Sequence, residues 1–252
     1  MTGSGEGAFG GRVAVVTGGS RGMGREVVRA LAARGADVVI ASRKLGACEA
    51  LAEEVRREHG VRALAVACNV SSWSDCDRLV EEAYAAFDRV DVLVNNAGLS
   101  PLYPSLAEVS EELFDKVIGV NLRGPFRLAA AIGTRMAAGD GGSIVNISSI
   151  EADRPGPHAL PYAAAKAGLN ALTEGFAAGF APKVRVNTVQ PGAFLTDISQ
   201  AWTEETTERI ARGVALGRCG EPEEIVEAVL YFAGPGSSYT TGATLRVDGG
   251  WR

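Results

Sequence analysis

The chain of 252 residues has little of what a metal centre or a disulfide framework needs. It contains two histidines, His59 and His158, and four cysteines that form no CxxC pair and no other metal-ligand spacing. A histidine-based metal site is therefore not expected. The cysteines fit small, buried, reduced residues. We predict no bound metal.

Long apolar runs and an excess of positive charge are also missing. No segment approaches the roughly 20 apolar residues that span a bilayer. The first eleven residues carry five glycines and lack the cationic and then apolar pattern of a secretory signal. The formal net charge is −5 without a basic stripe, which argues against nucleic-acid binding through bulk charge. We expect a cytoplasmic protein with no membrane or nucleic-acid partner.

The sequence does contain a regular alternation of apolar runs and helical patterns. Periodicity of the helical kind occurs, for example, over Gly24–Arg34, Cys48–His59 and Cys76–Phe87. The alternation predicts an α/β fold, a doubly wound Rossmann-type parallel seven-stranded sheet with helices on both faces. The strand candidates are dense in Val, Ile and Leu, as is typical of strands covered on both faces, and are Arg12–Thr17, Asp37–Ala41, Arg62–Ala67, Asp91–Asn95, Gly142–Ser148, Lys183–Val189 and Ala243–Val247.

No Pro/Gly-rich linker or charge run divides this pattern. The composition, 46% hydrophobic and 22% charged, allows one large domain with a substantial core. We expect a flexible leader over residues 1–10 and a single dinucleotide-binding and catalytic domain over residues 11–252.

The first predicted strand runs into a glycine-rich segment, Gly18-Gly19-Ser20-Arg21-Gly22-Met23-Gly24, which opens the first helix. Its glycines form a TGxxxGxG pattern rather than GxGxxG. Glycine lets the backbone approach a pyrophosphate, whose charge is attracted by the N-terminus of the helix. A glycine turn without a ligand is the alternative. The strand–loop–helix context favours a phosphate site of a dinucleotide.

The adenosine ribose of such a cofactor is expected at the end of the second strand, where the chain reads Ser42-Arg43-Lys44. An acidic residue there would hold the 2′-hydroxyl of NAD, but none is present, and Asp37 is at the wrong end of the strand. Arg43, with Ser42 and with Arg21 from the glycine loop, suits a 2′-phosphate. Alternatively, both arginines are solvated loop residues. The pattern favours NADP(H) over NAD.

Tyr162 and Lys166 are four residues apart, which places them on one face of a helix. A lysine ammonium beside a phenol favours the phenolate. We therefore expect the pKa of Tyr162 to be lowered from about 10 towards the range of a working acid or base. By itself the pair also fits an ordinary exposed helix.

Together these motifs resemble those of short-chain dehydrogenases/reductases, and the resemblance covers about residues 11 to 250. The carbonyl and 3-oxoacyl reductases of about this length look most similar. The resemblance rests on TGGSRGMG, on Asn95-Asn96-Ala97-Gly98, on Ser149 thirteen residues before Tyr162, on the Tyr-x-x-x-Lys pair, on Pro191-Gly192 and on the ending Gly242–Gly250.

The resemblance implies four catalytic residues. Tyr162 would be the acid or base at the carbonyl oxygen, and Lys166 would lower its pKa and bind the nicotinamide ribose. Ser149 would donate a hydrogen bond to the developing alkoxide. Ser148 is the adjacent competitor, and the spacing to Tyr162 favours Ser149. Asn121 would complete a proton relay to Lys166 through water.

Pro125 gives separate evidence about the role of Asn121. Because Pro125 has no N–H to donate to the Asn121 carbonyl, a helix over residues 121–135 would be kinked here and would leave that carbonyl free for the relay water. Alternatively, Gly124-Pro125 starts the helix and Asn121 is its cap. The sequence leaves both readings open.

The cofactor contacts beyond the glycine loop are implied by the resemblance. Asn69-Val70 departs from the family, where an Asp commonly binds the adenine amine; the Asn69 carbonyl and the Val70 backbone would give a weaker contact. The full expected set is Gly18, Ser20, Arg21, Gly22, Met23, Gly24, Ser42, Arg43, Asn69, Val70, Asn95, Ala97, Gly98, Tyr162, Lys166, Pro191, Gly192 and Thr196.

The substrate is expected beyond the carboxyl ends of the strands. Asp197–Gly213 is either a mobile lid or an ordinary amphipathic surface helix. Glu151 either contacts the substrate or is a solvated loop acid, and His158 fits a surface cap. The expected lining suits a medium-sized, partly apolar carbonyl compound and comprises Leu99, Leu102, Tyr103, Ile150, Glu151, Phe194 and Trp202.

The leading hypothesis is an NADP(H)-dependent oxidoreductase that transfers hydride between nicotinamide and a carbonyl or secondary alcohol carbon, acting as a ketone or 3-oxoacyl reductase. Alternatives are an NAD-dependent alcohol dehydrogenase and a non-catalytic nucleotide-binding or scaffolding module. A binder of a nucleoside methyl donor would need the missing acid after the second strand. The resemblance also implies a homodimer or homotetramer, often formed through the helices that carry Asn121 and Tyr162.

Overall fold

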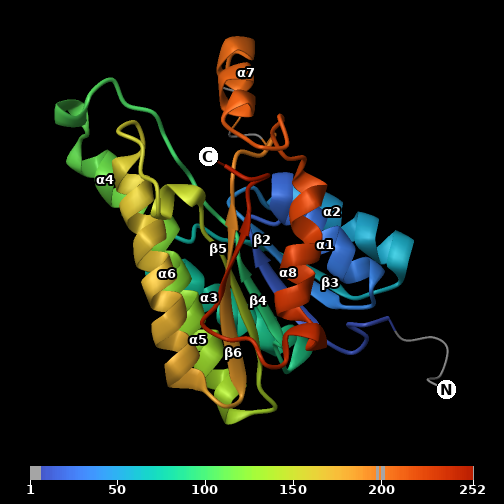
Figure 1. Cartoon of the computed structure of the whole chain (residues 1–252). Helices are drawn as coiled ribbons and strands as arrows, with labels where there is room; N and C mark the ends of the chain where they lie inside the picture. The colour runs from blue at the N-terminus through green and yellow to red at the C-terminus, as the bar shows by residue number, and fades with distance from the viewer. Residues whose placement is uncertain (1–6, 197–198, 200–201, 252) are drawn as a thin grey trace.

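The computed structural model describes residues 7–196, 199 and 202–251 (Figure 1). The elements alternate as the sequence pattern predicts. In chain order they are β1 (Val13–Thr17), α1 (Gly22–Ala33), β2 (Asp37–Ser42), α2 (Leu45–His59), β3 (Ala63–Ala67), α3 (Trp73–Phe87), β4 (Val92–Asn95), η1 (Leu106–Glu108), α4 (Glu111–Ile118), η2 (Gly119–Arg123), α5 (Gly124–Ala138), β5 (Gly142–Ile147), η3 (Ile150–Ala152), α6 (Leu160–Phe180), β6 (Val184–Pro191), α7 (Glu204–Arg212), η5 (Pro222–Ile225), α8 (Val226–Ala233), η6 (Pro235–Ser237) and β7 (Thr244–Val247).

The strands of the described residues form one parallel sheet of seven, in the order β3-β2-β1-β4-β5-β6-β7. Each strand lies within two residues of its predicted bounds, and the predicted fold class is confirmed. The strand order reverses between β1 and β4, whose register pairs Val15 with Leu93. Such a switch point opens a crevice at the carboxyl ends of the strands, where ligands bind.

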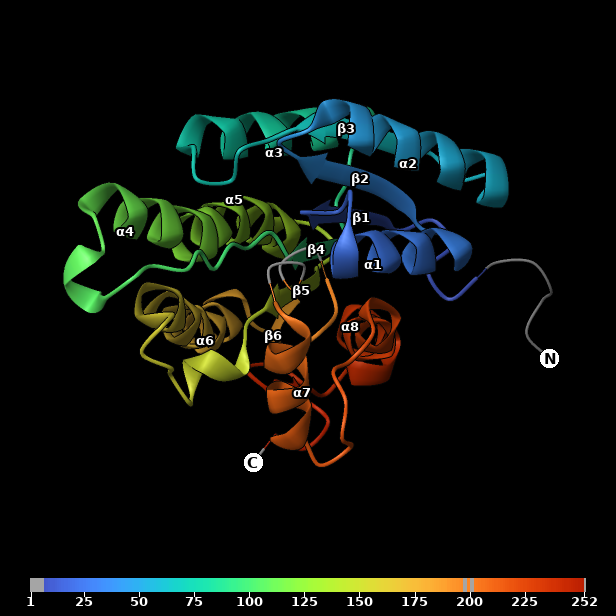
Figure 2. The same cartoon turned by 90° about the horizontal axis from the view of Figure 1, so that it is seen from above.

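Helices cover both faces of the sheet (Figures 1 and 2). One buried cluster joins α1, α2 and α8 to one face, with Leu31, Ile40 and Val229 among its members. The other joins α3 and α5 to the opposite face around Leu93 and Leu128. The sheet is therefore a middle layer with apolar side chains on both sides, as the unbroken apolar runs predict.

Three helices begin earlier than the apolar periodicity indicates, because their first residues do not continue the buried stripe: Leu45 and Trp73 are exposed. The predicted start at Gly24 becomes Gly22 in α1, Cys48 becomes Leu45 in α2, and Cys76 becomes Trp73 in α3. In α3 the start is set by Ser72, whose Oγ accepts a hydrogen bond from the Asp75 N–H at 3.2 Å.

The end of the expected leader packs against the body of the protein. Phe9 is buried, and its N–H donates to the Arg34 carbonyl at 3.0 Å. Ordered packing thus begins before the boundary expected at residue 11. No helix of the described residues is long and apolar enough to cross a membrane.

Candidate functional site

The four expected catalytic positions converge at the carboxyl edge of the sheet. Ser149 follows β5, Tyr162 and Lys166 lie on α6, and Asn121 lies in the π-helical turn η2. A Cβ built on Gly98 would lie 3.1 Å from Asn121 Oδ1 and 3.7 Å from Lys166 Nζ, so both side chains reach the loop after β4. Ser149 is within hydrogen-bonding reach of the Tyr162 phenol.

The pKa of Tyr162 is not lowered as the sequence argument predicts. Burial raises it to about 12, although a hydrogen bond with Ser149 opposes the shift. Burial also lowers the pKa of Lys166 to about 7. The prediction is wrong for this state because enclosure disfavours phenolate and ammonium alike, and the lysine is only partly charged at neutral pH.

The amine of Lys166 is held by a backbone carbonyl at the end of β5 and not by Tyr162. Its Nζ donates to the Ile147 carbonyl at 2.7 Å and lies 5.5 Å from the centre of the Tyr162 ring. The side chain is buried. The strand end thus fixes the amine within reach of the tyrosine while leaving other Nζ protons available to a further acceptor.

The two serines after β5 have different surroundings. Ser148 is buried, and its hydroxyl donates to the Lys166 carbonyl at 3.3 Å, which ties β5 to α6. Ser149 lies beside Tyr162, and its Oγ accepts a hydrogen bond from the Glu151 N–H at 3.2 Å. The geometry favours Ser149 over Ser148 as the hydroxyl that faces a substrate.

Asn121 does not cap a helix. Its Nδ2 donates to the carbonyls of Leu99 and Val117, both at 2.9 Å, and its Oδ1 accepts from the Leu99 N–H at 3.3 Å. The chain continues through η2 into α5, and the Gly124 N–H bonds back to the Gly119 carbonyl. The helix is irregular at this point, with a π-helical turn before α5 and Pro125 in the first turn of α5. That the Asn121 carbonyl is free for a relay water stays a prediction.

The glycine loop is packed too tightly for side chains. A Cβ on Gly24 would lie 2.3 Å from the Gly18 carbonyl oxygen, and Gly18 itself has φ +62°. Arg21 occupies the N-cap of α1, and an arginine side chain carries no acceptor atom that could satisfy the N–H groups of the first turn. No acidic residue occupies that turn either. These features fit a dinucleotide phosphate, which would supply the missing acceptors.

The loop after β4 holds the glycine loop in place. Asn96 Nδ2 donates to the carbonyls of Thr17 and Gly18 at 2.9 and 3.2 Å, while Thr17 Oγ1 accepts from the N–H groups of Asn96 and Ala97, both at 3.1 Å. Asn95, by contrast, is buried and donates to Asn146 Oδ1. Asn95 steadies the sheet, whereas Asn96 and Thr17, absent from the expected set, organise the loop.

The loops after β1 and β2 meet where the ribose was expected. Ser20 Oγ donates to Ser42 Oγ at 2.9 Å. Arg21 and Arg43 are both exposed on these two loops. The second loop therefore presents a hydroxyl and a cation, and no carboxylate, next to the glycine loop.

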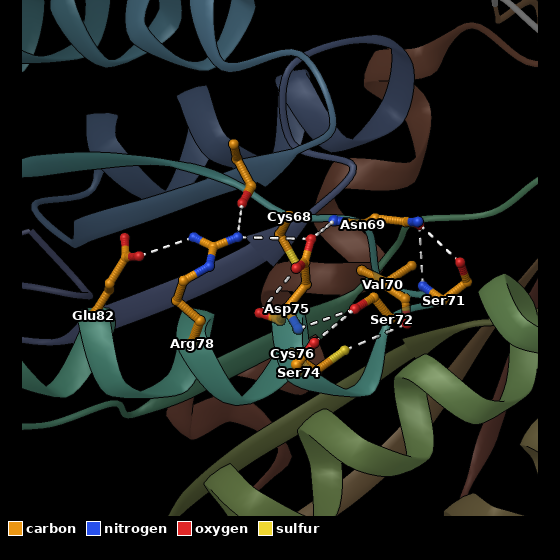
Figure 3. Close-up of polar contacts among 11 residues, drawn as sticks. Cys68, Asn69, Val70, Ser71, Ser72, Ser74, Asp75, Cys76, Arg78 and Glu82 are labelled. Atoms are coloured by element: carbon orange, nitrogen blue, oxygen red, sulfur yellow. Dashed lines mark hydrogen bonds and ion pairs between the residues drawn. The ribbon is translucent and has the colours of Figure 1, made fainter.

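The segment after β3 is arranged differently from the expectation (Figure 3). Asn69 Oδ1 accepts from the N–H and the hydroxyl of Ser71 at 3.3 and 2.9 Å, and the Asn69 N–H donates to Asp75 Oδ2 at 2.9 Å. The amide oxygen expected to meet the adenine amine is thus already engaged. The Val70 carbonyl packs against Gly124, where a Cβ would lie 2.3 Å away.

The segment after β6 faces the glycine loop. A Cβ on Gly22 would lie 3.6 Å from Thr196 Cβ. Pro191 ends β6, and the Gly192 N–H donates to the Val247 carbonyl at 2.9 Å. Thr196 is therefore close enough to the glycine loop to contact a group bound there.

Tyr103 and Leu99 lie around the reacting end of the site. The Tyr103 hydroxyl accepts from the Leu160 N–H at 2.9 Å and donates to the Pro157 carbonyl at 2.8 Å, which fastens the loop after β4 to the start of α6. A narrow apolar pocket between Tyr103 and Tyr162 is also lined by Val117 of α4. Leu99 is half-buried above Asn121.

The other residues expected near the substrate have different surroundings. Glu151 Oε2 accepts from the Gly156 N–H at 2.7 Å, so it stabilises its own loop. His158 is exposed and does not cap α6, whose N-cap is Ala159. Phe194 is buried over Gly220 and offers little surface to a ligand.

Trp202 is half-buried just before α7. Helix α7 has no buried residue and projects from the carboxyl edge of the sheet (Figures 1 and 2). Asp197, where the predicted lid starts, lies outside the described residues. The lid stays a prediction.

A family model described as enoyl-(acyl carrier protein) reductase matches residues 18–252. The chain belongs to the short-chain dehydrogenase/reductase family. It is therefore an oxidoreductase of a family that uses nicotinamide cofactors. Within the described residues, no group of three or more His, Cys, Asp or Glu is placed to hold a metal ion.

Similar proteins carry several activities in their names. The chain is 39% identical to short chain dehydrogenase/reductase astE of Aspergillus oryzae (95% of this chain, 94% of the relative). It is 35% identical to a 3-oxoacyl-(acyl-carrier-protein) reductase, FabG, of Aquifex aeolicus (95% and 97%). The structure of an NADPH-dependent 3-quinuclidinone reductase from Rhodotorula rubra superposes with a TM-score of 0.91 at 29% identity, covering 96% and 91% of the two chains.

Proposed function

We propose that this oxidoreductase uses NADP(H) to reduce the carbonyl group of a medium-sized, partly apolar substrate to a secondary alcohol. The observation that carries the proposal is the convergence of Ser149, Tyr162 and Lys166 at the carboxyl edge of the sheet, next to the crevice between β1 and β4. The glycine loop and the uncapped start of α1 supply the neighbouring phosphate site.

Residues of this chain donate the proton to the carbonyl oxygen and stabilise the negative charge that develops on it. Tyr162 keeps its proton at neutral pH because burial raises its pKa to about 12, and it is the acid that protonates the carbonyl oxygen. Ser149 donates a hydrogen bond to that oxygen as negative charge develops. When bound, NADPH supplies the hydride that reduces the carbonyl carbon. Lys166 binds the nicotinamide ribose and, when charged, stabilises the phenolate left after proton transfer.

The choice of NADP(H) rests on the loops after β1 and β2. Arg43 and Arg21 are exposed there, the Ser20–Ser42 hydrogen bond brings the loops together, and β2 ends without a carboxylate. A 2′-phosphate would be bound by such guanidinium groups. The NADPH dependence named for the similar reductase of Rhodotorula rubra supports this choice. An NAD-dependent alcohol dehydrogenase is the second candidate.

The proposed substrate class follows from the surroundings of Tyr162. The pocket beside it is apolar, with Pro101, Leu113 and Val117 in its wall. The apolar character of these surroundings agrees with a ketone or a 3-oxoacyl compound, and the names of the similar reductases support either. We propose that the reaction takes place in a single domain, to whose core Phe9 also belongs, and that the protein is a cytoplasmic homodimer or homotetramer.

Thermal unfolding of the purified protein with NADPH, NADP, NADH and NAD in parallel tests the cofactor. A ligand at a hundred times its dissociation constant stabilises by about 2.7 kcal/mol, which raises the melting temperature visibly. We expect a shift with the phosphorylated pair alone. A shift with NADH alone would replace NADP(H) by NAD, and no shift with any of the four would contradict the enzyme function.

NADPH oxidation with a panel of cyclic ketones and 3-oxoacyl thioesters then tests the reaction. The proposal requires ketone-dependent loss of NADPH absorbance that the Tyr162→Phe variant does not catalyse. A binding module of the same fold would give a thermal shift without any turnover.

A further inference from the structure

A chain of buried polar side chains runs beneath the site. Asn146 on β5, Thr173 on α6 and Thr188 on β6 are each at most 1% exposed. Thr173 Oγ1 lies 2.9 Å from Asn146 Nδ2, 2.8 Å from Thr188 Oγ1 and 3.0 Å from the Leu169 carbonyl oxygen. Asn146 Oδ1 in turn accepts from Asn95 Nδ2 at 2.9 Å.

The Thr173 hydroxyl uses its full hydrogen-bonding capacity. A hydroxyl has one proton and two acceptor positions. The proton goes to the Leu169 carbonyl, which only accepts, so the amide of Asn146 and the hydroxyl of Thr188 are the donors to Thr173. Removing this oxygen would leave two buried donors without their acceptor, which is costly.

The same two elements carry the site. Ser149 lies three residues after Asn146 at the end of β5, and Thr173 lies two helical turns after Lys166 on the same face of α6. The hydrogen bond between Asn146 and Thr173 therefore fixes the height and rotation of α6 over β5. Ser149 and Tyr162 depend on that register for their mutual distance.

Apolar packing alone defines this register weakly. Apart from Leu169, the fully buried apolar side chains of α6 are small, among them Ala163, Ala165 and Ala177, and the larger Phe176 and Phe180 are only partly buried, with Phe180 packed on Gly133 of α5. Alanine side chains leave low ridges that resist sliding and rotation less than large interlocking side chains do. Hydrogen bonds are directional, so a hydroxyl with all its hydrogen bonds formed favours one arrangement of the two elements.

We propose that Thr173 is a positioning residue for the reaction: its hydroxyl sets the register of α6 on β5 and hence the alignment of Tyr162 with Ser149. The inference rests on the proposed function. It predicts a selective loss, because misalignment lowers the rate of the chemical step. The glycine loop and its phosphate contacts lie on β1, β4 and α1, away from Thr173.

The test compares Thr173→Val with Thr173→Ser, which keeps the hydroxyl, and with Ser143→Ala. Ser143 is a matched control because its buried hydroxyl also bonds a carbonyl, that of Phe232 at 2.7 Å, but at the amino end of β5. For each protein one measures kcat and KM for NADPH with an active ketone, the Kd for NADPH, and the melting temperature.

We expect folded Thr173→Val to lose at least about tenfold in kcat, since small misplacements of reacting groups cost up to about a hundredfold. Its Kd for NADPH should stay within about threefold, which is less than 1 kcal/mol. Thr173→Ser should recover most of kcat, and Ser143→Ala should keep it despite a lowered melting temperature.

Three results overturn the inference: Thr173→Val with the kcat of the wild type, Thr173→Ser as impaired as Thr173→Val, or Ser143→Ala with an equal loss of kcat. If Thr173→Val does not fold, Thr173→Cys replaces it, because a thiol is a weaker donor and acceptor; wild-type kcat in that variant overturns the inference too. An inactive wild type with every ketone would instead contradict the proposed function, and this inference with it.

Discussion

Lys166 and Tyr162 lie in surroundings that disfavour the charged forms of both side chains. The pKa of the lysine is lowered to about 7 and that of the tyrosine is raised to about 12, in each case chiefly by burial. For a reductase this is useful, because Tyr162 reaches the carbonyl still protonated. The charge of Lys166 then becomes important only when a phenolate forms beside it.

The pKa of Lys166 makes the stability of the cofactor-free protein depend on pH. In the unfolded chain a lysine titrates near 10.4. Between about pH 7 and pH 10 the unfolded chain therefore binds more protons at this position, and stability rises with pH. We expect Lys166→Met to melt higher than the wild type at pH 6, with the difference shrinking towards pH 9. A constant difference across this range would contradict the lowered pKa.

The phenol of Tyr162 is the proton donor in the proposed reaction. Tyr162→Phe should lose at least about two orders of magnitude in kcat, since general acid catalysis contributes about 10²–10⁴. The Kd for NADPH should change little, because the ring remains. Tyr103→Phe is the comparison: it removes a second phenol near the site, one that bonds the backbone groups of Pro157 and Leu160 in the described structure. Full activity in Tyr162→Phe would refute the role.

In our proposal Arg43 gives the protein its preference for NADP(H) over NAD(H). Arg43→Asp places a carboxylate where NAD-dependent enzymes of this fold hold the ribose hydroxyls, and it opposes a 2′-phosphate. The ratio of kcat/KM for NADPH to that for NADH should fall at least about tenfold, or 1.4 kcal/mol. Arg57→Asp, at the far end of α2, controls for the change in net charge. An unchanged ratio would place the phosphate elsewhere.

At the scale of elements, patterns in the sequence predicted the strands better than the helix starts and the polar contacts. Apolar runs identified every strand, because burial on both faces leaves a strong signal. The first turn of α3 left none, because its apolar residue Trp73 faces outward, and the start depends on the cap by Ser72. Pro125 did indicate the irregular helix, but only the structure decides between a cap and a π-helical turn.

The polar contacts that the sequence patterns did not indicate join residues far apart along the chain. Asn96 and Thr17 are 79 positions apart, and Asn146 and Thr173 are 27 apart. Neither pair has a local spacing that periodicity could reveal. Asn69 differs, because its oxygen bonds Ser71 only two positions on, a local turn contact that Asn side chains commonly make and that the comparison with the family motif overlooked.

Helix α1 approaches the glycine loop closely only because residue 24 is glycine. An alanine Cβ would overlap the Gly18 carbonyl and the Asn96 amide, at 2.3 and 2.4 Å. Overpacking typically costs about 1–3 kcal/mol. We expect Gly24→Ala to lower the melting temperature and to weaken NADPH binding by at least about tenfold, since the loop must move. Gly46→Ala in α2 meets nothing within 4 Å and should be neutral or stabilising. Equal behaviour of the two variants would contradict this view of the loop.

At the scale of the whole molecule, one sheet positions both halves of the site. In our proposal the loops after β1, β2 and β4 form the cofactor end, and β5 and α6 carry the reacting end. The switch point lies within the cofactor end, between β1 and β4, and β5 is the next strand along the sheet. The seven apolar runs predicted this sheet. Which loops touch depends on the strand order, and single contacts such as Ser20 with Ser42 secure it.

The outer face of α3, α5 and α6 is the surface on which we expect a second copy of this chain. Trp73, Phe126, Phe176 and Phe180 form a continuous row of rings with neighbouring centroids 6.2, 5.6 and 5.3 Å apart. Trp73 and Phe126 are 45% and 38% exposed. Monomeric proteins rarely leave such contiguous apolar surface in water. Phe176 and Phe180 lie on α6, which carries Tyr162 and is one of the helices that the family resemblance implies for assembly, and Phe126 lies on α5, directly after the turn that carries Asn121.

Light scattering coupled to size-exclusion chromatography tests this assembly. The wild type should elute with the mass of a dimer or tetramer, and Phe126→Glu should reduce that mass, because an interface with a charge in its apolar centre loses several kcal/mol. Leu45→Glu changes a residue of similar exposure, 41%, at the start of α2 and should leave the mass unchanged. A monomeric wild type, or equal masses for Phe126→Glu and wild type, would rule out this face. Dissociation should lower the melting temperature as well, since the exposed rings then return to water.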